Sequence, residues 1–169
     1  DVSSFYSQIF VNYNLPKGFS LNLKLLKGRN YADAEYSISK NFDIAQYKVN
    51  PSMTWILKTI LRTSLGYEYN RKQNIPELGN ELAKGNKFNF DIRYSIVSKQ
   101  TIEAKFSFVL FDYNGVNGTT KSYQILDGLQ PGKNYVWNAV YNRTLANNLQ
   151  LNISYEGRKT GNSNQIVHT

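Results

Sequence analysis

The stretch that decides the fold is residues 87–110, KFNFDIRYSIVSKQTIEAKFSFVL. Apolar side chains occupy every second position of its first half, at Phe88, Phe90, Ile92, Tyr94 and Ile96. They do so again in its second half, at Ile102, Ala104, Phe106, Phe108 and Leu110. Successive side chains of a strand point to opposite faces, so this period of two predicts two strands, each with one apolar and one polar face. The polar residues 98–100 between them predict a short turn.

The same alternation recurs on both sides of this hairpin. Further segments carry it at residues 5–15, 19–27, 45–57, 61–69, 135–145 and 149–155. Pro51 fits poorly, because proline removes a hydrogen-bond donor from the ladder. We therefore predict one all-β domain over residues 1–169, with eight antiparallel strands and the start of a ninth at 165–169. Strands of roughly nine to eleven residues suit a tilted crossing of a bilayer, whereas strands in soluble sheets average about five or six.

The connections between the predicted strands alternate in length. Short links fall at residues 15–18, 58–59, 98–100 and 146–148, and long links at 28–43, 70–86, 112–134 and 157–165. Outer-membrane barrels have short periplasmic turns and longer external loops, so the alternation predicts an antiparallel transmembrane β-barrel segment. It also puts both ends of this stretch on the long-loop side. Because bacterial barrels have even strand numbers, we expect these strands to be part of a larger barrel of ten or more strands.

Composition excludes several classes of function. No window approaches the eighteen apolar residues of a membrane-spanning helix. The absence of cysteine excludes disulfides, thiolate metal sites and cysteine nucleophiles, and the single histidine, His168, excludes His-based triads and multi-histidine metal sites. The basic residues behind the net charge of +8 are scattered along the chain rather than clustered, which argues against nucleic-acid binding. We expect no catalytic residues, no metal and no cofactor, and do not expect an enzyme.

The polar face of the predicted strands carries charges of both signs. Its members are Lys24, Lys48, Arg62, Glu68, Asp91, Arg93, Glu103 and Lys105. In a barrel they would face the lumen, as a hydrated wall, a selectivity surface or a surface that binds a plug. Asp91 and Glu103 could act as an acid–base pair, but Arg93 and Lys105 share their face, so cross-strand ion pairing is the favoured interpretation.

Two further sets of residues fit a membrane boundary. The first contains tyrosines near the long loops, Tyr67, Tyr69, Tyr113, Tyr135 and Tyr155, which predict an interfacial aromatic girdle. Ordinary cross-strand packing is the alternative explanation for them. The second contains basic residues assigned to the loops, Lys27, Arg29, Lys40, Arg71, Lys72, Lys84, Arg158 and Lys159. They would face anionic lipopolysaccharide.

The glycines of the 112–134 link are interpreted as turn signals. Gly115 and Gly118, and then Gly128 and Gly132, lack the Gly-Lys-Ser/Thr sequence of a phosphate loop, and no helix is predicted after either pair. Nucleotide binding is therefore not expected.

Several stretches resemble a known family. The first is YQILDGLQPGKNYVW at 123–137, followed by LQLNISYEGRK at 149–159 and Val167-His168-Thr169. Leu65-Gly66-Tyr67 with NRKQN at 70–74 adds to the likeness. Together they resemble the C-terminal end of large outer-membrane proteins of Bacteroidota. The resemblance implies an outer-membrane location and a closing strand that ends in an aromatic residue, which this sequence lacks.

Two functions remain open from the sequence. The first is an outer-membrane β-barrel segment, porin-like in architecture, with a role in transport, secretion or scaffolding. Its partners would be outer-membrane lipid and lipopolysaccharide, the remaining strands of the same barrel or complex, and surface lipoproteins. The alternative is a secreted soluble β-sandwich that binds ligands in the manner of a lectin, because sandwich strands also have one apolar and one polar face.

Overall fold

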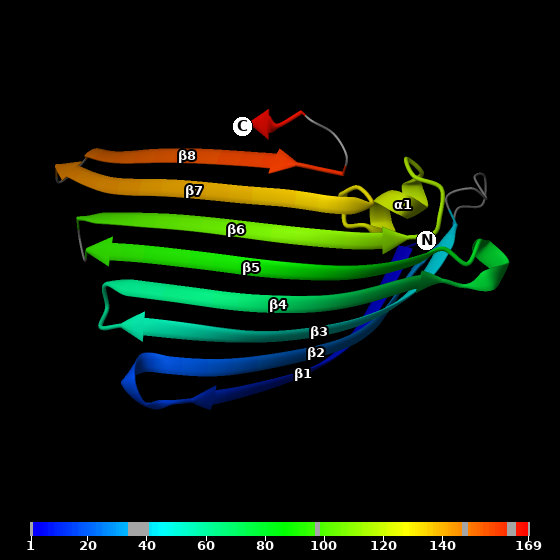
Figure 1. Cartoon of the computed structure of the whole chain (residues 1–169), viewed down its shortest axis with the longest axis horizontal. Coiled ribbons are helices and arrows are strands. Elements are labelled where there is room, and N and C mark those ends of the chain that lie inside the picture. The colour runs from blue at the N-terminus through cyan, green and yellow to red at the C-terminus, as the bar shows by residue number, and fades with distance from the viewer. Residues whose placement is uncertain (1, 34–40, 97–98, 147–148, 162–164, 169) are drawn as a thin grey trace.

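The computed structural model describes residues 2–33, 41–96, 99–146, 149–161 and 165–168. These residues form one nine-stranded antiparallel sheet in which each strand pairs with the next along the chain (Figure 1). The strands are β1 (Val2–Asn14), β2 (Phe19–Ala32), β3 (Phe42–Leu57), β4 (Leu61–Asn74), β5 (Leu82–Ile96), β6 (Gln100–Tyr113), β7 (Gly132–Ala146), β8 (Leu149–Lys159) and β9 (Val167–His168). The sheet is open, with β1 and β9 at its two edges. The predicted all-β antiparallel fold is confirmed, ninth strand included.

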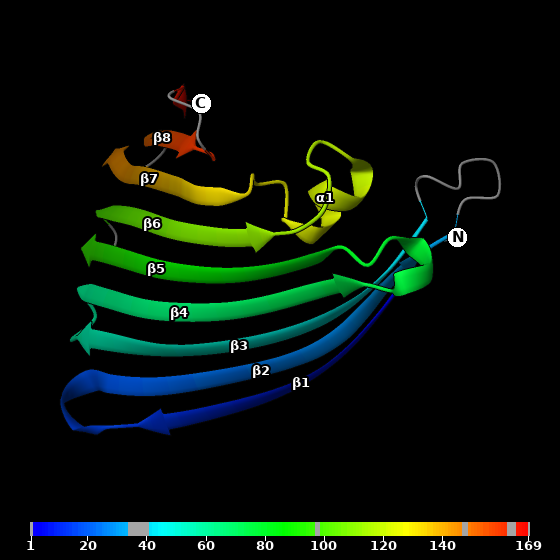
Figure 2. The ribbon, with the colours of Figure 1, turned by 45° about the vertical axis from the view of Figure 1, so that its right-hand side comes forward.

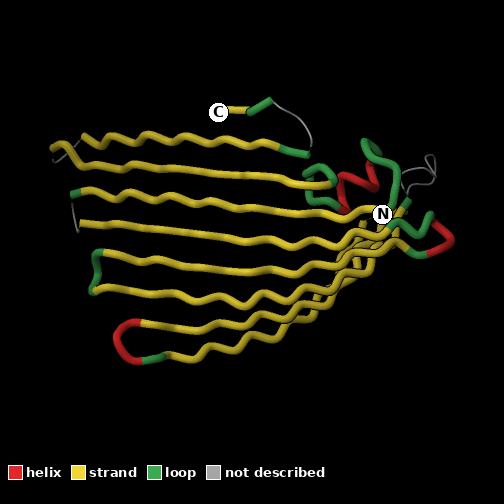
Figure 3. The backbone as a smooth tube through the Cα atoms, in the orientation of Figure 1, coloured by secondary structure: helices red, strands yellow, loops and turns green. Residues whose placement is uncertain are grey.

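Three short helical segments lie between the strands. They are the 3-10 turns η1 (Pro16–Gly18) and η3 (Pro76–Leu78) and the helix α1 (Thr120–Ile125), drawn in red in Figure 3. The β1–β2 and β3–β4 connections lie at one end of the sheet, and the β4–β5 and β6–β7 connections, with α1, at the other (Figures 1 and 2). Among the described residues, no helix is long and apolar enough to cross a membrane.

Most strands are longer than the sequence predicted. β3 has 16 residues and β5 has 15. The prediction ended each strand where apolar alternation faded, but the backbone ladder does not depend on apolar side chains and continues through polar residues. Arg71, for example, was assigned to a loop and lies in β4, paired with Lys84 of β5. The long links shrink accordingly, to residues 33–41 and 75–81.

The strand register sorts the side chains onto two faces, as the alternation predicted. Leu65 lies opposite Phe90, and Phe90 lies opposite Phe106. Continuing across the sheet, one face carries an apolar side chain at the corresponding position of each of the first eight strands except β8. Across β1 to β3 these are Val11, Leu23 and Pro51. Two residues farther along β3 the row continues with Met53, Leu65, Phe90, Phe106 and Trp137, with Gly157 of β8 opposite Trp137. We call this the apolar face and the other the polar face.

Aromatic rings form a continuous row across the apolar face. Tyr67 packs on Phe88 with ring centroids 5.1 Å apart, and Phe88 packs on Phe108 at 6.4 Å. Phe108 then packs on Tyr135 at 5.1 Å. Each neighbouring pair is also a register pair, so the four rings tie β4, β5, β6 and β7 together. Cross-strand aromatic pairs of this kind stabilise a sheet by roughly 0.5–1.5 kcal/mol each.

Pro51 lies inside β3, where a proline is unusual. Pairing of β3 with β2 continues through it, with Leu23 opposite Pro51. Pairing with β4 breaks there and resumes at Ser52. The missing N–H donor is thus accommodated by a local gap in one ladder, and the strand predicted at 45–57 is retained.

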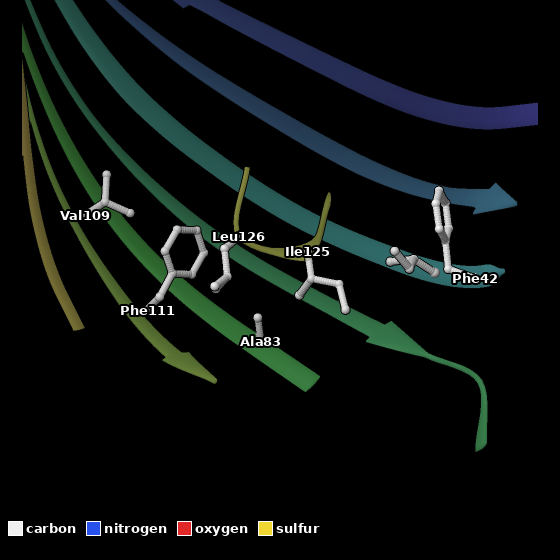
Figure 4. Packing of buried hydrophobic residues seen from close by; sticks show 7 residues of the cluster. Phe42, Ala83, Val109, Phe111, Ile125 and Leu126 are labelled. Atoms are coloured by element: carbon white, nitrogen blue, oxygen red, sulfur yellow. The ribbon is translucent and has the colours of Figure 1, made fainter. Parts of the chain in front are cut away.

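The buried core is small and lies at one end of the polar face. Its members are Phe42, Ile44, Ala83, Val109, Phe111, Ile125 and Leu126 (Figure 4). Ile125 ends α1 and Leu126 follows it, and both side chains are fully buried against residues of β3, β5 and β6. The core of this sheet is therefore the contact between α1 and the polar face.

Candidate functional site

The polar face brings together all eight charged residues that the sequence assigned to a lumen wall. They are Lys24, Lys48, Arg62, Glu68, Asp91, Arg93, Glu103 and Lys105. Arg93 lies opposite Glu103 and its Nε is 3.3 Å from a carboxylate oxygen of Glu103. Asp91 lies opposite Lys105 in the same pair of strands. Each carboxylate thus faces a cation across the ladder, which is the ion-pairing arrangement that the sequence favoured over an acid–base pair.

A chain of polar contacts joins β3 to β4 on this face. The Lys48 ammonium lies 3.0 Å from the Glu68 carboxylate, and the Asn50 amide donates to the other Glu68 oxygen at 3.1 Å. Farther along, the Gln46 amide donates to Asn70 at 3.1 Å. Among the described residues, no buried side-chain nitrogen or oxygen lacks a hydrogen-bond partner. Polar and charged groups are costly to bury without partners, and here the buried ones have them. The polar face is therefore an ordered hydrogen-bonded surface.

Lys72 corrects one of the loop assignments. The sequence placed it in a loop facing lipopolysaccharide, but it lies in β4 with only 5% of its side chain exposed. Its ammonium donates to the backbone carbonyl of Gln124 at 3.0 Å and to the carboxylate of Asp127. Lys72 therefore anchors the segment that carries α1.

The other basic residues assigned to loops also lie in strands. Lys27 and Arg29 belong to β2, Arg71 to β4, Lys84 to β5, and Arg158 and Lys159 to β8. Lys40 lies outside the described residues. Arg29 forms a bidentate pair with Asp43 of β3. Arg71 and Lys84 are exposed and lie directly opposite each other, closer to the α1 end of the sheet than the apolar side chains of their strands.

The predicted tyrosine girdle divides between the two faces. Tyr67, Tyr69, Tyr135 and Tyr155 lie on the apolar face. Tyr113 lies on the polar face, opposite Ala83, and packs beside the buried core. The prediction grouped these residues by their distance from the loops, but the face is set by odd or even position within each strand, and Tyr113 has the wrong parity. Tyr155 hydrogen-bonds the Nδ1 atom of His168 at 2.7 Å.

The apolar face is exposed over most of its area. Phe88, Leu65 and Ile153 are 53%, 51% and 53% exposed. A shallow groove of about 790 Å³ runs over this face, lined by side chains from β1 to β6. Charged residues follow the apolar ones along the same face at the α1 end of the strands, at Arg29, Arg71, Lys84, Asp112, Lys133 and Lys159. The result is an apolar band with a charged border.

The helix α1 is an element that the sequence analysis missed. No helix was predicted after Gly118, but Thr119 caps one that begins at Thr120. The Thr119 hydroxyl accepts from the Ser122 backbone N–H, and the Ser122 hydroxyl accepts from the Thr119 backbone N–H. This reciprocal cap is visible in the sequence as Thr119-x-x-Ser122, although serine is less typical than glutamate at its last position. The apolar pair Ile125-Leu126 was the second available signal.

The described residues contain no group of three or more His, Cys, Asp or Glu side chains that could hold a metal ion. A search of family models, curated proteins and solved structures found no match to this chain.

Proposed function

We propose that this chain forms part of the wall of a β-barrel in a bacterial outer membrane, with its apolar face toward lipid and its polar face toward water. One observation carries the proposal: an exposed apolar face extends over the long strands and ends in charged residues. The resemblance to outer-membrane proteins of Bacteroidota agrees with this location. The role that fits is transport, secretion or scaffolding.

The height of the apolar band supports a bilayer environment. On β5 it runs from Phe88 to Ile96 and on β3 from Tyr47 to Leu57. At about 3.3 Å a residue these paths are roughly 26–33 Å long. Tilted by 35–45°, they would span roughly 19–27 Å, a range that includes the ~25 Å apolar band of outer-membrane barrels.

The exposed surface is too large for a compact soluble domain. The chain exposes 11476 Å², whereas a folded monomer of 19.4 kDa exposes about 8500 Å² by the usual scaling of area with mass. Contiguous apolar patches on soluble monomers rarely exceed a few hundred Å². A soluble sandwich would need a second sheet over the apolar face, and the described residues form one sheet.

The open edges call for further strands. β1 has no paired neighbour on one side, and it contains no charged residue and no proline that would discourage pairing. In hydrocarbon each unpaired backbone group costs several kcal/mol, so only closed sheets span membranes. We propose that strands of the same protein or of a complex complete the wall.

The charged border gives the proposed partners their chemistry. Arg71 and Lys84 are adjacent, exposed and of the same sign. Anionic groups of lipopolysaccharide would relieve their repulsion. Surface lipoproteins are a further class of partner at this end of the sheet.

Cysteine labelling tests the proposed orientation directly, because the chain has no native cysteine. The neighbouring substitutions Asn89→Cys and Phe90→Cys place a thiol on the polar and the apolar face respectively. In outer-membrane vesicles from cells that express the full-length protein, we expect a water-soluble maleimide to label Asn89→Cys and to spare Phe90→Cys. Detergent solubilisation followed by unfolding should make both thiols reactive. Equal labelling in vesicles, or recovery of the protein in the soluble fraction, would contradict the proposal.

A further inference from the structure

The connection between β6 and β7, residues 114–131, folds back over the polar face. Figure 4 shows Ile125 and Leu126 beside Ala83 and Phe111 of the sheet. Both α1-segment side chains have 0% exposure. The segment thus covers part of the surface that would otherwise be open to water.

Polar contacts hold the same segment at the start of α1 and at its C-terminal end. Lys72 of β4 binds the Gln124 carbonyl and Asp127. Lys121 donates to the Leu78 carbonyl and lies 3.9 Å from Glu81, in the connection before β5. One set of contacts comes from strand β4 and the other from the β4–β5 connection, so together they oppose hinging of the segment.

The base of the segment is fixed by a buried amide. Asn134 of β7 has 0% exposure, and its amide nitrogen donates to the Gln130 carbonyl at 2.8 Å and the Gly132 carbonyl at 3.1 Å. Its amide oxygen accepts from the backbone N–H of Gln130 at 3.2 Å. The chain therefore enters β7 from a defined direction, on the side of the polar face.

A cavity of about 270 Å³ lies between this segment and the sheet. Its charged lining comprises Lys48, Glu68, Lys87 and Asp127. Glu68 is paired with Lys48, and Asp127 with Lys72. Among the described residues no acidic group lies within ion-pair distance of Lys87, although Glu68 is its register partner. Together with Lys72, which pairs with the lining residue Asp127, this group contains three cations and two carboxylates, so Lys87 is the cation in excess.

We propose that residues 114–131 form a fixed constriction in the water-filled passage, and that Lys87 at its edge makes the passage favour small anions. This inference rests on the proposed function, because it needs the polar face to line a lumen. A cation in a narrow, partly desolvated opening acts on passing ions far more strongly than one on a wide wall.

Lys24 provides a matched control for Lys87. It lies on the same face, opposite Asn50 in the strand register. Asn50 hydrogen-bonds Glu68, and Glu68 lies opposite Lys87 in the register of β4 and β5. The two lysines are thus at the same level of the sheet, three strands apart, and only Lys87 lines the cavity next to α1. In an unobstructed lumen both would contribute equally to ion selectivity.

The test uses the full-length protein in planar bilayers with a chloride salt gradient. We expect Lys87→Gln to lower the chloride-over-cation permeability ratio at least twofold, and Lys24→Gln to change it little. Undocking the segment with Ile125→Asn and Leu126→Asn should raise single-channel conductance about twofold and remove the effect of Lys87→Gln. Ile125→Ala, which leaves the charges of the cavity unchanged, offers a milder undocking variant if the double substitution does not assemble.

Three results would overturn the constriction. They are equal effects of the two lysine substitutions, an unchanged single-channel conductance after undocking, and an inserted protein that conducts ions neither with the segment docked nor with it undocked. Failure of the proposed function is distinguished by the cysteine labelling above. If the apolar face is not protected from labelling in vesicles, both proposals are overturned. If it is protected and any of these three results is observed, only the constriction is overturned.

Discussion

At three positions of the sheet, Gly28, Gly85 and Gly157, a glycine faces an aromatic ring that takes the space of its missing side chain. A Cβ built on Gly85 would lie 2.5 Å from a ring carbon of Phe111, its register partner. We expect Gly85→Ala to destabilise the sheet by about 1–3 kcal/mol, because Phe111 must leave a packed position in the core. Gly66→Ala is the control, since its Cβ would meet ordinary contacts at 3.6 Å or more. Urea midpoints followed by gel mobility would measure both, and equal shifts would refute the packing explanation.

The pair Lys72–Asp127 should respond asymmetrically to substitution. Lys72 is 5% exposed and Asp127 is 54% exposed. Asp127→Asn leaves a buried cation without its counter-charge, which typically costs about 3–5 kcal/mol. Lys72→Met leaves only a half-exposed carboxylate and should cost about 1 kcal/mol.

The double variant completes this experiment. Because Lys72→Met removes the buried charge, the double substitution should be less destabilising than Asp127→Asn alone in a urea titration. An Asp127→Asn variant as stable as the wild type would show that the pair contributes nothing to docking of α1.

The sequence was sufficient to predict which face of the sheet a strand residue lies on, because the face depends on odd or even position within the strand. It placed Arg93 and Glu103 on one face, where they pair. Lys72 and Tyr113 were misplaced because a loop boundary was assigned before parity was counted. The partner of Lys72 lies 55 positions away in the chain, and no local pattern contains that information.

At the level of the element, β1 offers a test of which face meets lipid. Ile9 and Gln8 are neighbours on opposite faces of this strand. A lysine on the lipid-facing side of a barrel costs about 2–4 kcal/mol near the bilayer midplane. Ile9→Lys should therefore reduce the yield of assembled protein in the outer membrane, and Gln8→Lys should leave it close to the wild type. Identical yields from the two variants would argue against lipid on the apolar face.

The elements differ in how much of each the sequence could reveal. The strands were predictable because alternation persists over many residues, and even Pro51 did not obscure β3. Their ends were less predictable, because polar residues such as Asn74 stay buried and hydrogen-bonded near the end of the ladder. The six-residue α1 is stabilised by its tertiary contacts, since an isolated helix of that length does not form in water.

At the scale of the whole molecule, loop lengths and alternation predict the meander topology. Consecutive antiparallel strands joined by short links pair with their neighbours in sequence, and the observed order β1 to β9 follows. Closure has a different origin, because it depends on which strand meets the free edge of β1. The same two-faced sheet serves a barrel or a sandwich, and the surrounding medium decides which arrangement is stable.

The two tryptophans report on that medium for the molecule as a whole. Trp55 of β3 and Trp137 of β7 lie on the apolar face of the sheet, four strands apart. In bilayers that contain lipids brominated on their acyl chains, we expect quenching of both, with little quenching by aqueous acrylamide. Trp55→Phe and Trp137→Phe variants would separate the two signals. A soluble sandwich predicts the reverse for any exposed tryptophan ring, because acrylamide reaches the ring and bromine on an acyl chain does not. Strong acrylamide quenching without bromine quenching would therefore place the apolar face in water or against protein.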